Sequence, residues 1–109
     1  MEEVTKLAKE LIAIPSVSGG EVEILKFCAD WFRGMKFDDV FTDDMFTAGV
    51  VRVASGTAPR ALILCGHVDT VAPGDESAWS RNPWQAYVRD GRLYGLGSGD
   101  MKMGVALQM

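Results

Sequence analysis

The amino-acid sequence predicts an α/β fold, and three observations lead to this prediction. Two amphipathic helical patterns come first, over residues 2–13 and 21–33. A uniformly aliphatic run follows at Ala61–Cys65, a pattern typical of a strand buried on both faces of a helix-covered sheet. The helical pattern at residues 101–109 is too short to persist alone, and two earlier helices cover only part of such a sheet. We therefore expect residues 1–109 to be the opening portion of a larger α/β domain.

Composition and charge restrict the class of protein. Apolar residues make up 48% and charged residues 24%, which suits a globular domain. A net charge of −4 without blocks of like charge argues against a nucleic-acid partner. The longest aliphatic run is too short for a membrane span, and two cysteines without a secretory leader favour a reducing cytoplasm.

Each helix has an apolar stripe. In the first helix the stripe consists of Val4, Leu7, Ala8, Leu11 and Ile12. Pro15 should end that helix, because proline cannot donate a backbone hydrogen bond. In the second helix the inward residues are expected to be Val22, Leu25, Cys28, Ala29 and Phe32.

Short strands are predicted between the second helix and the glycine-rich segment. Residues 37–41 and 50–53 have strand character, with loops at residues 43–44 and 55–59. Residues 87–89 and 92–94 flank Asp90-Gly91, a dipeptide that suits a two-residue hairpin turn with positive φ.

The first candidate for chemistry is the pair His67 and Asp69, directly after the aliphatic run. Residues two apart in extended backbone point to the same side, so these side chains can interact. A metal-bound histidine commonly donates its other ring N–H to such a carboxylate. A purely structural histidine–aspartate hydrogen bond explains the same pattern.

The second candidate is Asp100, which follows Gly95-Leu96-Gly97-Ser98-Gly99. A carboxylate on a glycine-rich loop can approach a divalent cation closely, although it can equally cap a helix that begins at Met101. The spacing is not that of a dinucleotide or phosphate-binding loop, so nucleotide binding is excluded.

A cysteine hydrolase is a further chemical alternative, since Cys65, His67 and Asp69 alternate along one strand face. Nucleophile, base and orienting acid normally converge from separate elements, so the geometry is poor. We expect Cys65 and Cys28 to be small buried apolar residues.

Several motifs in register resemble one known enzyme family. They are Gly66-His67-Val68-Asp69-Thr70-Val71, Pro73-Gly74-Asp75, Trp79, Asn82-Pro83-Trp84, Asp90-Gly91-Arg92-Leu93-Tyr94-Gly95 and Gly97-Ser98-Gly99-Asp100-Met101-Lys102, with Ile14-Pro15-Ser16-Val17-Ser18-Gly19 before them. This order is similar to that of the zinc amidohydrolase and exopeptidase family, which includes acetylornithine deacetylase, succinyl-diaminopimelate desuccinylase, aminoacylase and glutamate carboxypeptidase.

The resemblance implies a zinc-exopeptidase type of fold, a helix-covered mixed sheet of which this chain is a truncated N-terminal portion without the dimerisation domain. It implies that His67 binds one of two zinc ions, that Asp100 bridges both, and that Asp69 orients His67; cobalt is an alternative metal. Substrates would be N-acylated amino acids or small peptides, and the full-length protein would be a homodimer.

The family's later Glu-Glu pair, further acidic ligand and second histidine are not present, and Met103 stands where a glycine is usual. We therefore expect the isolated chain to be catalytically silent. Two other hypotheses stay open: a non-enzymatic module that docks with a complementary chain, and a small acidic α/β domain with an incidental His-Asp pair.

Overall fold

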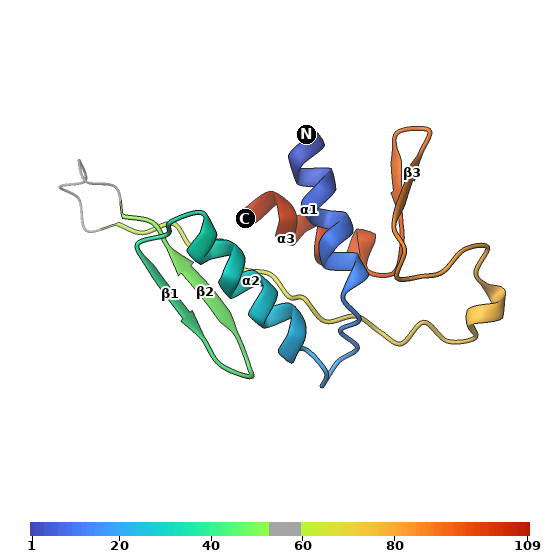
Figure 1. The fold of residues 1–109 in the computed structure, drawn as a ribbon, viewed down its shortest axis with the longest axis horizontal. Coiled ribbons are helices and arrows are strands. Elements are labelled where there is room, and N and C mark those ends of the chain that lie inside the picture. Colours follow the sequence, from blue (N-terminus) through green and yellow to red (C-terminus); the bar gives the residue numbers. More distant parts are fainter. Residues whose placement is uncertain (53–59) are drawn as a thin grey trace.

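A computed structural model describes residues 1–52 and 60–109. In these ranges three α-helices, α1 (Glu2–Ala13), α2 (Val22–Gly34) and α3 (Met103–Gln108), accompany two hairpins. The hairpins are β1 (Asp39–Thr42) with β2 (Thr47–Val50), and β3 (Tyr87–Arg89) with β4 (Arg92–Tyr94). Figure 1 shows them at opposite ends of the molecule. The α/β class is confirmed, whereas the helix-covered mixed sheet stays a prediction.

Helix α1 has the predicted bounds. It ends at Ala13, and Ile14 is extended with φ −94° and ψ 107°, as expected for a residue that precedes proline. Its buried residues are Leu7, Ala8, Leu11 and Ile12. The predicted apolar stripe of this helix is confirmed, with Val4 half-buried at its edge.

Helix α2 begins one residue later than predicted and ends at Gly34. Its buried residues are Ile24, Leu25, Cys28 and Ala29. The prediction that Val22 faces inward is wrong. Val22 lies in the first turn of the helix and is exposed, and Ile24 is the first buried residue instead.

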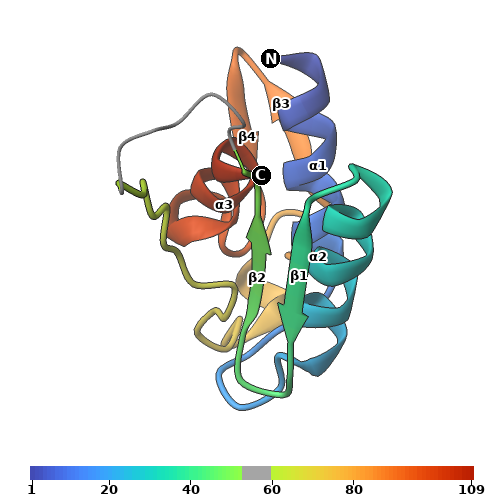
Figure 2. The ribbon, with the colours of Figure 1, turned by 90° about the vertical axis from the view of Figure 1, so that its left-hand side faces the viewer.

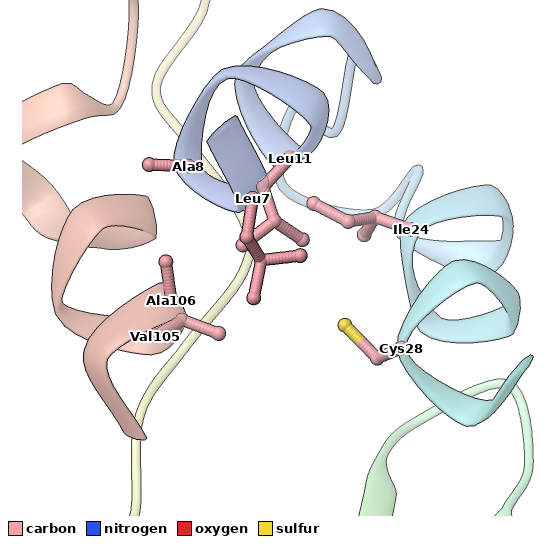
Figure 3. Packing of buried hydrophobic residues seen from close by; sticks show 7 residues of the cluster. All are labelled: Leu7, Ala8, Leu11, Ile24, Cys28, Val105 and Ala106. Atoms are coloured by element: carbon pink, nitrogen blue, oxygen red, sulfur yellow. The ribbon is translucent and has the colours of Figure 1, made fainter. Parts of the chain in front are cut away.

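The hydrophobic core lies between the three helices. Leu7 and Leu11 of α1 are central, with Ile24 and Cys28 of α2 on one side and Val105 and Ala106 of α3 on the other (Figure 3). The six-residue helix α3 is thus docked on α1, as its length requires.

The hairpin β1–β2 packs on α2 with Val40 opposite Gly49. A Cβ atom at Gly49 would lie 2.6 Å from the Phe37 ring and 2.8 Å from the Phe32 ring, so only glycine fits beneath these aromatics. The prediction of a strand at residues 50–53 is wrong in position, because β2 ends at Val50. Residue 53 and the loop predicted at residues 55–59 lie outside the described residues.

The hairpin β3–β4 has the predicted turn. Asp90 and Gly91 adopt φ values of 51° and 72°, the positive values that a two-residue turn of this type requires. The rings of Tyr87 and Tyr94 stack across the strands with centroids 5.0 Å apart.

The prediction of a buried central strand at Ala61–Cys65 is wrong for the structure as described. Leu62 is 85% exposed and Ile63 is 82% exposed, and the segment is not a strand. A strand needs a neighbouring strand whose backbone N–H and C=O groups form hydrogen bonds with its own. In residues 1–52 and 60–109 the paired strands bond only within their own hairpins. The aliphatic segment therefore runs along the outside of the molecule beside α3 (Figure 2).

The molecule is extended for its size. Its radius of gyration is 15.4 Å, whereas a compact domain of this length has about 13 Å. Among the helices of the described ranges, none has the length and apolar character needed to cross a membrane.

Candidate metal centre

The backbone of residues 68–70 is held by the segment that follows α1. Thr70 N donates to Ser16 O at 2.9 Å, and Ser18 N donates to Thr70 O at 3.1 Å, so Val17 and Thr70 form a parallel bridge. The buried Ser16 hydroxyl also donates to Val68 O at 2.7 Å. These bonds fix the extended backbone that carries His67 and Asp69.

The two ring nitrogens of His67 face two different carboxylates. Nδ1 lies 3.1 Å from Asp69 Oδ1 and forms its hydrogen bond with the main-chain Asp69 O at 3.2 Å, and Nε2 lies 2.8 Å from Asp100 Oδ1. The predicted side-by-side placement of His67 and Asp69 is present, and the distant Asp100 joins them. We call Ser18, His67, Asp69 and Asp100 the histidine cluster, because the Ser18 hydroxyl donates to Asp69 Oδ2 at 2.5 Å.

Asp100 does not cap a helix, so that alternative is wrong. Helix α3 begins at Met103 and its N-terminal flanking residue is Lys102, which makes no side-chain cap. Asp100 itself is extended, with φ −132° and ψ 94°, and its side chain contacts His67 instead. Gly97, with φ 81°, lets the preceding loop pass closely over Thr70: a Cβ atom there would lie 2.7 Å from Thr70 Cγ2.

The carboxylates favour a positively charged ring. The hydrogen bond with Asp100 is the main cause that raises the pKa of His67 above 6.5, against a smaller desolvation effect. The hydrogen bond from Ser18 is the main cause that lowers the pKa of Asp69 below 3.8. Both effects are moderated by solvent, because the His67 side chain is 47% exposed and the Asp100 side chain is 89% exposed.

Lys102 supports the loop that carries Asp100 from the opposite side. Its side chain is fully buried, and Nζ donates to Leu11 O at 2.9 Å and to Ile14 O at 2.8 Å, the carbonyls at the end of α1. Burial lowers the pKa of Lys102 to about 8, and the nearby Cys28 opposes this effect. The same burial raises the pKa of the Cys28 thiol to about 11.

An open pocket lies over the histidine cluster. Its lining residues are Ser18, His67, Asp69, Thr70, Val71, Leu96, Gly97 and Asp100. Cys65 is not one of them and is exposed, so our expectation that it is buried is wrong, whereas Cys28 is buried as expected. The geometry gives no support to a cysteine nucleophile.

The donor atoms fit part of a metal site. Imidazole nitrogen and carboxylate oxygen are both zinc ligands, and here they converge from separate segments while Asp69 holds the second ring nitrogen. Zinc usually takes three or four protein ligands. No group of three or more candidate ligand side chains occurs in residues 1–52 and 60–109. His67 and Asp100 therefore fit as one side of a cation site.

Part of the chain is similar to a known protein family. Residues 63–109 match peptidase family M20/M25/M40. The chain is therefore similar to that family over this stretch. The predicted resemblance to the amidohydrolase and exopeptidase family is thus confirmed over an N-terminal stretch.

Several named proteins are similar to this chain over nearly its whole length. It is 36% identical over 106 residues to an acetylornithine deacetylase of Photorhabdus laumondii, with 89% of this chain and 27% of that protein covered. It is 36% identical over 107 residues to a succinyl-diaminopimelate desuccinylase of Methylorubrum extorquens, covering 94% and 28%. A protein of the latter name from Gluconacetobacter diazotrophicus is 40% identical over 108 residues, covering 92% and 26%. The chain spans about a quarter of the length of these relatives.

The sequence did not indicate the roles of two residues that support the site, Ser18 and Lys102. The segment with Ser18 was noted only as part of a resemblance, and Lys102 only as part of a motif. Their partners lie 51 and 91 residues away, so no local pattern could show the contacts. A lysine two positions after a candidate ligand, at the start of an apolar segment, was the one available signal for Lys102.

Proposed function

We propose that the protein to which this chain belongs is a metal-dependent amidohydrolase that cleaves the amide bonds of N-acyl amino acids or small peptides. The observation that supports it most is the approach of His67 Nε2 to Asp100 Oδ1 at 2.8 Å, with Asp69 on the other ring nitrogen, within a stretch of peptidase family M20/M25/M40. The relatives named deacetylase and desuccinylase support the substrate class.

In this proposal His67 Nε2 and Asp100 would hold a divalent cation, zinc or alternatively cobalt, and the Asp100 carboxylate would also be available to a second ion. When bound, the cation supplies Lewis-acid activation of the amide carbonyl and of water. Asp69 would accept a hydrogen bond from Nδ1–H of His67, at its main-chain O 3.2 Å away and beside its carboxylate Oδ1 3.1 Å away, which would keep the Nε2 lone pair free for the ion. The general base and the remaining ligands belong to parts of the protein other than residues 1–109, and the functional form is a cytoplasmic homodimer.

Metal binding and hydrolysis by the complete polypeptide test the proposal. We expect the zinc-loaded protein to hydrolyse N-acetyl or N-succinyl amino acids, and His67→Gln and Asp100→Asn each to lower kcat/KM by at least about 100-fold. Asp90→Asn is the matched control, because Asp90 is 86% exposed and lies in the β3–β4 turn. Normal hydrolysis by His67→Gln, or none by the loaded wild type toward acylated amino acids and dipeptides, would refute the proposal.

A second candidate function is a non-enzymatic module that docks with a complementary chain. The exposed aliphatic segment Leu62–Leu64 favours it, because such a run is normally paired and covered. Residues 1–109 would then associate with a chain that carries the missing ligands. Gel filtration of the two chains mixed in equal amounts tests it, and separate elution at micromolar concentration would exclude it.

A further inference from the structure

The hydroxyl of Ser18 is the outermost member of the histidine cluster. It donates to Asp69 Oδ2 at 2.5 Å, while Asp69 Oδ1 lies 3.1 Å from His67 Nδ1. The two oxygens of one carboxylate therefore have different partners. The Ser18 bond restrains the carboxylate with Oδ1 beside Nδ1, which also forms a hydrogen bond with the main-chain Asp69 O at 3.2 Å.

The backbone around Ser18 is also fixed relative to Asp69. Ser18 N donates to Thr70 O at 3.1 Å, and on the other side of the bridge Thr70 N donates to Ser16 O at 2.9 Å. The side chain of Ser18 thus extends from a segment that is paired with the residue next to Asp69. The alternative acceptor for its hydroxyl, Thr70 O, is more distant at 3.4 Å.

We propose that Ser18 is a positioning residue for the metal centre, acting through Asp69 to hold the His67 ring with Nε2 directed at the cation. This inference rests on the proposed function for its metal, but its geometric part concerns residues of this chain alone. It makes the segment between α1 and α2 a part of the site. In this proposal Ser18 touches neither the ion nor the substrate. Its effect must therefore appear in how firmly the His67 ring is held in one orientation.

The chain offers a matched control for removing one hydroxyl. Ser77 donates from its hydroxyl to Asp75 Oδ1 at 2.7 Å in an exposed turn, which reproduces the serine–aspartate bond away from His67. Ser18→Ala and Ser77→Ala therefore remove the same chemical interaction. Ser18→Thr keeps the hydroxyl and is the conservative rescue.

The first readout is zinc affinity of the complete polypeptide, measured by competition with a chelating dye. Removing an outer partner of a metal ligand typically weakens affinity about 10- to 100-fold. Ser18 is one bond further out, so we expect about 10-fold weaker binding in Ser18→Ala. Ser77→Ala should stay within about 2-fold of wild type, and Ser18→Thr within about 3-fold. Equal affinities in Ser18→Ala and Ser77→Ala would overturn the proposal.

The second readout needs no metal and separates this inference from the proposed function. In the metal-free polypeptide at pH 6, labelled with ¹⁵N-histidine and assigned with His67→Gln, the protonated ring has one N–H toward Asp69 and one toward Asp100. We expect Ser18→Ala to broaden the Nδ1–H signal by faster exchange while the Nε2–H signal stays. Ser77→Ala should change neither signal. If wild type binds no zinc but this selective broadening occurs, the proposed function fails and the positioning by Ser18 stands. Unchanged Nδ1–H exchange in Ser18→Ala overturns the inference, whatever the affinity.

Discussion

The helical core and the aliphatic segment before His67 have similar apolar character and opposite environments. Leu11 of α1 is fully buried between α2 and α3, whereas Ile63 is 82% exposed. The partners of Leu11 are present in the chain, and no strand of the described residues pairs with the segment of Ile63. The comparison teaches that apolar character gives a segment a tendency to be buried. Whether the segment is in fact buried depends on the presence of other segments that can pack against it or pair with it.

The largest test of this comparison is a pair of alanine substitutions. Leu11→Ala should lower the free energy of unfolding of the chain by about 2–5 kcal/mol, because it leaves a cavity among three helices. Ile63→Ala should change it by less than about 0.5 kcal/mol, because an exposed side chain loses no packing. Urea unfolding followed by circular dichroism measures both.

Similar losses in the two variants would contradict the comparison, since they would mean that residues 62–64 are covered in solution. Association of the chain with itself is the simplest way to cover them. Measuring the unfolding midpoint at two protein concentrations distinguishes this case, because only an associated form becomes more stable as concentration rises.

A second test compares two lysines. Lys102→Met should destabilise the chain by about 1–3 kcal/mol, because Leu11 O and Ile14 O lose their buried donor. Lys26→Met is the control, since Lys26 is 67% exposed and pairs with Glu23 at 3.9 Å. Equal unfolding midpoints for the two variants would show that the buried ammonium does not hold α1 to the Asp100 loop.

Lys102 also predicts a pH dependence. Burial lowers its pKa from 10.5 to about 8, so above pH 8 the unfolded chain binds more protons than the folded chain. Stability of wild type relative to Lys102→Met should therefore rise from pH 8 to pH 9. The raised pKa of Cys28 lowers the stability of each protein above pH 9, because the unfolded thiol ionises first, but Cys28 is common to both proteins and its effect cancels in their difference. A flat difference between the two proteins from pH 7.5 to 9 would contradict the burial of a charged Lys102.

Whether a contact could be predicted from the sequence depended on the number of residues that separate its two partners along the chain. The bounds of α1 and the Asp90-Gly91 turn follow from neighbouring residues, and so does the pairing of His67 with Asp69, two positions apart. The contact between His67 and Asp100 spans 33 residues and was accessible only through a family resemblance. The bonds of Ser18 and Lys102 span 51 and 91 residues and depend on how α1 is placed against the rest. Local periodicity contains no information on that placement.

The smallest expected effect concerns the ring of His67, the single histidine of the chain. Asp100→Asn should bring its raised pKa down toward 6.5, because the hydrogen bond with Asp100 is the main cause of the shift. In the wild type this interaction contributes stability that is fully present below pH 6.5 and is lost as pH rises through the folded-state pKa. The gain is modest, since both side chains are solvated. Proton NMR titration of the ring in metal-free chain measures the shift, with Asp90→Asn as control. If the pKa of the His67 ring is the same in Asp100→Asn and Asp90→Asn, His67 and Asp100 are not in contact in solution. The exposed segment that carries His67 would then not be held against the glycine-rich loop that carries Asp100.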